Sequence, residues 1–345
     1  MQSQLSYFRG SFIFCALAVV AAYFIGGAKG AMTVIFLTML ETSLSFDNAV
    51  VNATILNGWD AVWRRRFLIW GMLIAVFGMR LVFPLLIVGI VGDMGPLKVL
   101  DLAVNQPDEY GRILTSAHHQ IAAFGGAFLM MVFLKFFVDR HKTEHWFHAL
   151  EAPLTRLGKL EAIEAALTLM LVLLFAGLLD EAVRSEFVIA GVWGVIVYIF
   201  AKGVAVLVGG DEASGHEQVV RQGIGGFLYL ELLDASFSFD GVVGAFAMTN
   251  NLFIITLGLG AGAMFVRSFT LLLVERSTLA TYRYLEHGAF WAIGALAAIM
   301  LAGAKFHIPE AVTGLVGAAL IGLSLGSSLL ANRKDAAKQV KLEQK

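Results

Sequence analysis

Two stretches of similar sequence determine how the chain can fold: ETSLSFDNAVVNA at residues 41–53 and DASFSFDGVVGAF at residues 234–246. In each stretch an acid is followed four residues later by Ser-Phe-Asp, and then by a run of mainly small apolar residues. The two copies are 193 residues apart. Because chance rarely reproduces the acid and the Ser-Phe-Asp in one register, we interpret them as an internal repeat.

Long apolar runs surround both stretches and predict a membrane protein. Of the 345 residues, 58% are apolar and only 15% are charged, whereas soluble domains carry about 25% charged residues. A membrane-spanning helix needs about 20 mostly apolar residues, and runs of that length without strict alternation favour helices over a barrel. The expected fold is therefore an all-α, polytopic transmembrane helical bundle. Its ten helices are expected at residues 11–28, 31–58, 67–91, 119–138, 162–179, 186–208, 223–249, 252–274, 287–304 and 309–330.

The composition argues against several classes of function. A formal net charge of −1 does not suit a nucleic-acid-binding protein. The single cysteine, Cys15, can form neither an internal disulfide nor a thiolate metal site. The sequence contains no HExxH motif and no phosphate-binding loop. We therefore expect no enzymatic activity, no prosthetic group and no nucleic-acid partner.

The order of the expected helices places the two copies in opposite orientations. The first copy lies in the second expected helix and the second copy in the seventh, so the two cross the membrane in opposite directions. Inverted repeats of this kind are typical of secondary transporters, whose binding sites lie near the midplane where the repeats meet. We expect one transmembrane domain over residues 1–331, with repeat halves of about 1–180 and 186–331.

The distribution of basic residues predicts the orientation in the membrane. Connections on one expected side carry 16 Lys and Arg residues, and those on the other side carry 5. By the positive-inside rule, both ends of the chain are expected in the cytoplasm, with the Lys-rich segment 332–345 as a cytoplasmic tail. Residues 11–28 also fit a signal peptide, and the sequence leaves open whether this helix is retained or cleaved.

Five acids fall within the apolar runs. A charged side chain at the bilayer centre costs about 2.5–3.5 kcal/mol, so these acids need cations, protons or hydrogen-bond donors as partners. Their oxygen-rich surroundings suit Mg²⁺, Ca²⁺ or Mn²⁺ better than Zn²⁺ or Cu²⁺. The candidate metal ligands are Glu41, Asp47, Asn48, Asp234 and Asp240, together with Ser45, Ser238 and Glu231. For Glu231 the sequence leaves open a role as a ligand or on the access path.

The spacing within each copy raises a geometric problem. On a straight helix Glu41, Ser45 and Asn48 share one face, whereas Asp47 lies about 120° away from Glu41. Either the two acids of each copy serve different sites, or the helix unwinds near Ser-Phe-Asp and lets both converge. We expect unwinding, which would give discontinuous helices and free backbone carbonyls for a cation.

Two basic residues within the apolar runs, Arg80 and Arg267, could neutralise some of the acids. The acids could then be structural ion pairs with no ligand. Five acids against two arginines leave a surplus of negative charge, however, and this surplus favours a cation-binding site. For the arginines themselves the sequence leaves two roles open, which are charge balance and gating.

The two motifs resemble those of the TerC family of membrane proteins, which carry E-x-x-L-S-x-D-N early and D-x-x-F-S-x-D-S late. The first copy fits fully, and the second fits except that Gly241 replaces the usual serine. GMLIAVFGMR at 71–80, LGLGAGAMFVRS at 257–268 and TYRYLEHG at 281–288 also agree. The resemblance covers about residues 31–330, while the segment 139–161 is typical of a longer subgroup.

The resemblance implies Mn²⁺ efflux across a bacterial inner membrane, with links to metal homeostasis and tellurite resistance. It implies as ligands Glu41, Asp47, Asn48, Asp234 and Asp240. The partners expected are the lipid bilayer and the divalent cation as substrate, with protons as a candidate coupling ion. The sequence leaves open which metal is carried and whether the chain forms a homo-oligomer.

Other interpretations remain. A membrane-bound metal sensor or assembly factor that does not transport would need the same acids. An intramembrane aspartyl protease would pair two aspartates, but its YD and GxGD patterns are not found here. His141, His145 and His148 could bind a metal, but we favour an amphipathic segment at the cytoplasmic surface, which explains the same residues.

Overall fold

The computed structural model describes residues 5–140, 142, 144–208, 223–246, 248–275, 282–306 and 308–343. These residues form helices joined by short connections, and no strand occurs among them. The chain is therefore all-α, as predicted. Seven helices among the described residues are long and apolar enough to cross a membrane, which indicates a multi-pass membrane protein.

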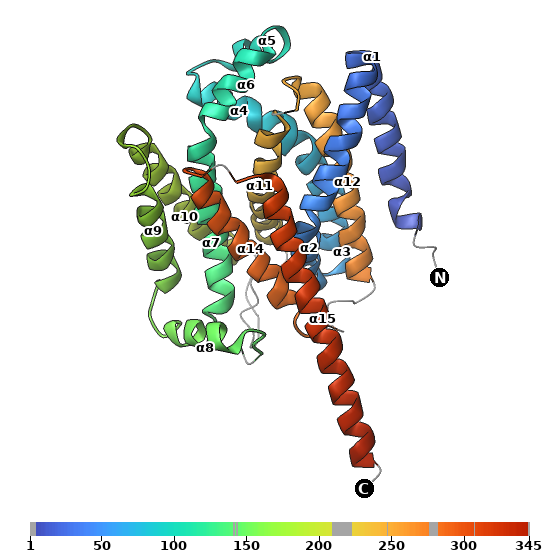
Figure 1. Cartoon of the computed structure of the whole chain (residues 1–345), viewed down its shortest axis with the longest axis vertical. Helices are drawn as coiled ribbons and strands as arrows, with labels where there is room; N and C mark the ends of the chain where they lie inside the picture. Colours follow the sequence, from blue (N-terminus) through green and yellow to red (C-terminus); the bar gives the residue numbers. More distant parts are fainter. Residues whose placement is uncertain are drawn as a thin grey trace.

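Each of the ten expected helices is present, with shifted boundaries. The elements are α1 (Leu5–Leu44), α2 (Phe46–Asn57), α3 (Ala61–Arg66), η1 (Phe67–Gly71), η2 (Ile74–Val82), α4 (Phe83–Val91), α5 (Pro96–Asn105), α6 (Pro107–Ser116), α7 (His118–Phe137), α8 (His148–Leu157), α9 (Ile163–Ala176), α10 (Glu181–Val208), α11 (Ile224–Ala245), α12 (Leu252–Glu275), α14 (Leu285–Gly303) and α15 (Glu310–Glu343). Figure 1 shows their arrangement.

The element α1 is a hairpin of two helices rather than one straight rod. Gly26 and Gly27 have non-helical backbone angles, with φ +62° and ψ −155° at Gly27. Glycine adopts this conformation readily because it has no Cβ. Figure 1 shows the two arms side by side in blue. The break falls close to the predicted boundary between the first two expected helices.

The third expected helix is wound in an unusual way. Between α3 and α4 the segments η1 and η2 are π-helical, with wider turns than an α-helix. π-helical turns are rare and are frequently found at functional sites. The apolar pattern does not indicate this winding, and η2 contains Arg80.

Short helices occupy two of the long connections. Prolines at the first turns of α5 and α6 favour two helices within residues 92–118, and α8 lies within 139–161. In Figure 1, α5 and α6 lie at one end of the bundle, and α8 lies at the other. The expected tail 332–345 continues α15 as a helix to Glu343 and projects from the bundle at the α8 end.

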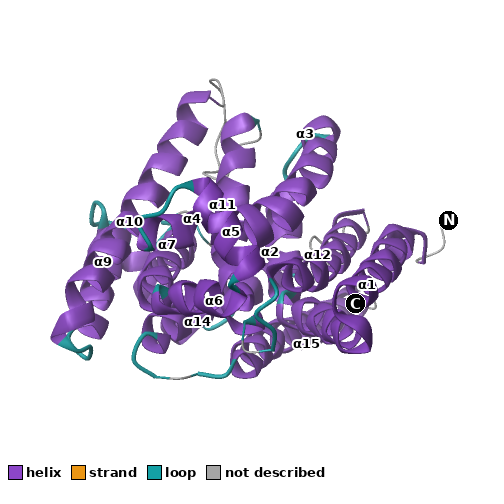
Figure 2. Cartoon of the chain, turned by 90° about the horizontal axis from the view of Figure 1, so that it is seen from above, coloured by secondary structure: helices purple, strands orange, loops and turns teal. Residues whose placement is uncertain are grey.

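Two packing units hold the motif helices in place. The most buried long helix, α7, packs between α10 and α14, where the rings of Phe136 and Phe290 stack at 3.7 Å between centroids. On the other side α12 packs along α1 and also contacts α2 and η2. Figure 2, seen from above, shows α2 and α11 in the middle of the bundle, between these units.

The hairpin predicts a specific sensitivity at Gly27. Gly27→Ala should lower the free energy of unfolding by about 1–3 kcal/mol, because alanine is strained at this φ and ψ. Gly10→Ala is the matched control, since a Cβ at Gly10 meets nothing within 4 Å and alanine favours a helix. Denaturant unfolding of the purified protein in detergent measures both. Equal effects of the two substitutions would contradict the hairpin.

Candidate functional site

The two motif segments meet in the interior of the bundle. The side-chain amide of Asn48 donates a hydrogen bond to Asp234 Oδ1 over 2.6 Å. A Cβ on Gly241 would lie 3.1 Å from Glu41 Oε2. Residue 41 therefore lies beside 241, and residue 48 beside 234, so the segments run antiparallel. Each contact joins the first acid of one copy to the eighth residue of the other, as a two-fold axis between inverted repeats requires.

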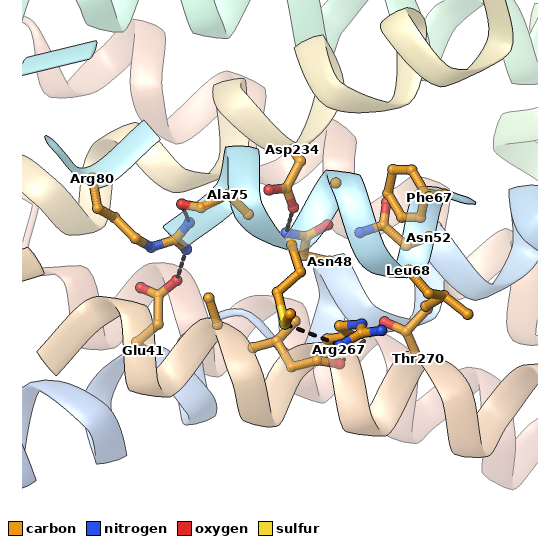
Figure 3. A pocket seen from close by; sticks show the side chains of 14 residues that line it. Glu41, Asn48, Asn52, Phe67, Leu68, Ala75, Arg80, Asp234, Arg267 and Thr270 are labelled. Atoms are coloured by element: carbon orange, nitrogen blue, oxygen red, sulfur yellow. Dashed lines mark hydrogen bonds and ion pairs between the residues drawn. The ribbon is translucent and has the colours of Figure 1, made fainter. Parts of the chain in front are cut away.

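A first cavity lies on one side of this crossing (Figure 3). It has a volume of about 40 Å³, room for about two or three water molecules. Its polar lining comes from Glu41, Asn48, Asn52, Asp234 and Thr270 and from both intramembrane arginines, Arg80 and Arg267. Phe67 and Leu68 at the start of η1 contribute apolar walls.

A second cavity of similar volume lies on another side of the crossing. Ser45 and Asp47 line it, together with Gly241 of the second copy and Thr313 and Gly314 in the first turns of α15. Asp47 is only 8% exposed and would contact a Cβ on Gly317. Small residues of α15 therefore leave space for this carboxylate.

Glu41 and Asn48 line both cavities, whereas Asp234 lines only the first and Asp47 only the second. Aspartates from different copies thus face different cavities. Within the first copy, however, Glu41 and Asp47 both line the second cavity, so these two acids converge there across the interruption at Ser45.

The helices are also less interrupted than expected. In the first copy the break is confined to Ser45, between α1 and α2, and the Ser45 amide still donates to the Glu41 carbonyl over 2.9 Å. In the second copy α11 runs without a break through the Ser-Phe-Asp segment. The interruption at Ser45 still gives α2 its own N-terminus, where the helix dipole favours the negative charge of Asp47.

The ion pair between Arg80 and Glu41 is the dominant electrostatic contact of the site. Arg80 Nη2 lies 2.5 Å from Glu41 Oε1, and the two residues are only 2% and 3% exposed. Arg80 Nη1 also donates to the carbonyl of Ala75 in the π-helical turn. One guanidinium thus occupies the place where a cation would meet Glu41 (Figure 3).

Arg267 is held differently. Its Nη1 lies 2.9 Å from the sulfur of Met72, and it makes no ion pair with the described acids. Asp234 receives the Asn48 amide instead of a guanidinium. Of the four predicted ligand acids whose side chains are described, only Glu41 is paired with an arginine.

The remaining predicted ligands are less central. Glu231 is 8% exposed, has no hydrogen-bond partner among the described residues and packs against Gly71, but it lines neither cavity. Ser238 is buried with its hydroxyl unpartnered within the described part. Asp240 lies in α11, and its side chain lies outside the described residues.

The described side chains do not form a closed metal cage. Among them, no three His, Cys, Asp or Glu residues gather closely enough to hold one metal ion. Instead, the two cavities at the crossing share one carboxylate, from Glu41, and one amide, from Asn48. We call each cavity a half-site. A cation in either cavity would complete its ligand shell with amide, hydroxyl or water oxygens, as hard divalent cations commonly do.

A comparison with protein-family models gives one match, described as "Protein of unknown function (DUF475)", over residues 46–335. The chain belongs to the DUF475 family. The match includes Asp47, Asn48 and the whole second motif, and it begins five residues after Glu41. No curated protein and no solved structure matches the chain.

Sequence reasoning missed two polar residues of this DUF475 site. Asn52 is 5% exposed, and its Oδ1 has no partner among the described residues. It lies one turn after Asn48 within the first motif, so the helical spacing could have found it. Thr270 lies one turn after Arg267 and donates to the carbonyl of Ala49 over 3.4 Å.

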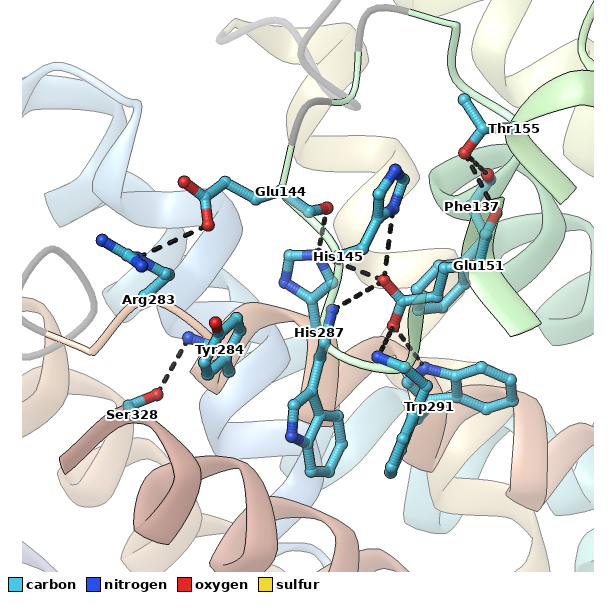
Figure 4. Close-up of polar contacts among 12 residues, drawn as sticks. Phe137, Glu144, His145, Glu151, Thr155, Arg283, Tyr284, His287, Trp291 and Ser328 are labelled. Carbon is cyan, nitrogen blue, oxygen red and sulfur yellow. Dashed lines mark hydrogen bonds and ion pairs between the residues drawn. The ribbon is translucent and has the colours of Figure 1, made fainter. Parts of the chain in front are cut away.

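His145 of the connection 139–161 lies in a polar cluster around Glu151 (Figure 4). His145 and His287 both lie 3.6 Å from the fully buried carboxylate of Glu151. Glu151 also accepts hydrogen bonds from the Trp291 indole and from two backbone amides. The cluster therefore anchors α8 to α14. His148 lies beside His145, and His141 lies outside the described residues.

The buried ion pair predicts a strong coupling between its members. Arg80→Gln should cost about 3–5 kcal/mol of unfolding free energy, because Glu41 is left buried without a countercharge. Adding Glu41→Gln should recover part of that loss, so the two effects are not additive. Denaturant unfolding of the two single variants and the double variant in detergent measures this coupling as a double-mutant cycle.

The matched control is Arg112→Gln, which removes an arginine from an exposed pair with Glu109 and should change stability little. Additive effects of the substitutions at positions 41 and 80 would show that the pair does not form.

Proposed function

We propose that the chain transports a divalent cation, Mn²⁺ foremost, out of the cytoplasm through the crossing of its two acidic motifs. The observation that carries this proposal is the pair of cavities that share Glu41 and Asn48. A transporter needs a binding site that can be reached from either side in turn. Two half-sites with common ligands on different sides of one crossing suit that requirement.

The positions of the cavities along the helices support alternate access. The first cavity includes Phe67, just after the three arginines of α3, and Thr270 near the end of α12. The second includes Thr313 near the start of α15. If basic connections lie in the cytoplasm, Phe67 and Thr270 of the first cavity lie toward the cytoplasmic ends of their helices, and Thr313 of the second lies toward the opposite side of a bacterial inner membrane.

The ligand chemistry supports a hard divalent cation. Carboxylate, amide and hydroxyl oxygens line the cavities, and no cysteine or histidine is among the described residues that line them. Such oxygens favour Mn²⁺, Mg²⁺ and Ca²⁺ over Cu²⁺. The TerC-like motifs favour Mn²⁺ among these. The TerC motif has a serine hydroxyl at the position of Gly241, beside Glu41. Because Gly241 has no side chain, water would complete that position.

In the cycle that we propose, the cation enters the first cavity, contacts Asp234 and Asn48, and displaces Arg80 from Glu41. Rearrangement of the two halves then passes it to Asp47 in the second cavity. Protons from the opposite side neutralise the acids during the return. No covalent chemistry is involved, so the protein acts as a carrier and not as an enzyme.

The test is Mn²⁺ flux in liposomes that contain only the purified protein and an enclosed Mn²⁺-sensitive dye. Asp47→Asn and Asp234→Asn should each lower the flux at least about tenfold, because each removes a charged ligand from one cavity. Asp180→Asn is the matched control and should leave flux unchanged, since the Asp180 side chain is 88% exposed.

Two results would overturn the proposal. Wild-type flux in both buried variants would show that the acids do not carry the ion. Saturable Mn²⁺ binding without flux in the unaltered protein would identify a metal sensor or assembly factor. Parallel assays with Mg²⁺, Ca²⁺, Ni²⁺ and tellurite determine the specificity.

A further inference from the structure

The helices that follow the two motifs also correspond to each other. GMLIAVFGMR at residues 71–80 aligns with GLGAGAMFVR at residues 258–267, with an offset of 187 residues. The alignment pairs Gly71 with Gly258 and Arg80 with Arg267. The offset differs from that of the motifs by six residues, so the connection after the first motif is longer.

Contacts in the bundle follow this correspondence. Gly71 packs against Glu231, and the carbonyl of Gly258 accepts a hydrogen bond from Thr38 over 3.1 Å. Thr38 and Glu231 are 193 residues apart, so they are equivalent under the motif repeat. The two contacts are therefore equivalent and are related by the two-fold axis.

The third helices of the two halves also cross antiparallel. Thr256 donates to the carbonyl of Arg80 over 3.1 Å, and a Cβ on Gly260 would lie 3.0 Å from Val76. In these contacts, higher residue numbers in α12 face lower residue numbers in η2. The two helices therefore run antiparallel, like the two motif segments. Arg80 and Arg267 thus occupy equivalent positions in a two-fold arrangement.

Their interactions are not equivalent. Arg80 is paired with Glu41, the first acid of its own copy. The equivalent partner of Arg267 is Asp234, but Arg267 contacts Met72 instead. The winding differs in the same way, because η2 is π-helical and α12 is α-helical. The two halves of one sequence repeat are thus in two different conformations.

We propose that Arg80 and Arg267 neutralise Glu41 and Asp234 alternately, as the two halves exchange these conformations. In the second state Arg267 pairs with Asp234 while Arg80 releases Glu41. The exchange has a physical basis, since a carboxylate released into the interior must find a positive partner. It rests on the proposed transport function, in which it keeps one acid neutral and the other free to bind the cation.

The π-helical turn is the element that switches. Arg80 lies within the π-helical segment η2, where its Nη2 pairs with Glu41 while its Nη1 donates to the carbonyl of Ala75 in the same segment. Rewinding η2 as an α-helix turns Arg80 away from Glu41. The same change in reverse at α12 turns Arg267 toward Asp234.

Thiol labelling of the full chain tests this exchange without measuring transport. Two reporters, Thr270→Cys in the first cavity and Thr313→Cys in the second, are made separately in a Cys15→Ser background, which removes the only native cysteine. A charged thiol reagent is applied to each purified protein in detergent with a chelator present. Mass spectrometry then gives the labelling rate with and without Arg80→Gln or Arg267→Gln.

Arg80→Gln should change the two rates in opposite directions by about fivefold or more, and Arg267→Gln should reverse both signs. Arg80→Lys, which keeps the charge, should restore rates toward those of the parent, and Arg112→Gln at an exposed arginine should change neither. Should Arg80→Gln fail to fold, Arg267→Gln and Arg80→Lys still decide the outcome.

Changes of the same sign in both arginine variants, or no response to Arg267→Gln, would overturn the exchange. Flux is a separate readout. Reciprocal labelling without Mn²⁺ flux would keep the exchange and reject transport, whereas flux without reciprocal labelling would reject the exchange alone.

Discussion

A carboxylate in the interior of a helical bundle must have a positive or hydrogen-bonding partner, and this constraint governs the whole site. Glu41, Asp47 and Asp234 are each less than 10% exposed, and each has a different kind of partner. Glu41 takes the guanidinium of Arg80, and Asp234 takes the amide of Asn48. Asp47 takes a backbone amide at the start of α2. Only the first of these partners carries a full charge.

The antiparallel crossing explains why so few residues can serve two cavities. Because the first acid of each copy faces the eighth residue of the other, Glu41 and Asn48 lie at the boundary between the cavities, with Asp234 and Asp47 on different sides. The two eighth residues differ chemically, because Asn48 carries an amide and Gly241 has no side chain. Glu41 then lacks a hydroxyl neighbour where Asp234 has an amide, and Arg80 satisfies it instead.

The sequence predicted those features that depend on periodicity and repetition. Apolar runs located the ten helices, and the repeated Ser-Phe-Asp identified the segments that meet. The geometry within the site was harder to predict. We expected an unwound segment near Ser-Phe-Asp, but in the first copy the irregular backbone is confined to one residue, Ser45. The π-helical winding around Arg80 depends on packing between helices, which neither hydropathy nor motif spacing encodes, whereas Asn52 could have been found one turn after Asn48.

The most direct test of this account measures which motif residues are neighbours. Pairs of cysteines at positions 41 and 241, or at 48 and 234, should be joined rapidly by a short bifunctional thiol reagent in a Cys15→Ser background, as the antiparallel contacts require. Pairs at 41 and 234, or at 48 and 241, should react much more slowly. Faster linkage of the latter pairs would mean that the motifs run parallel, and slow linkage of all four pairs would mean that they lie apart; either result would exclude the shared site.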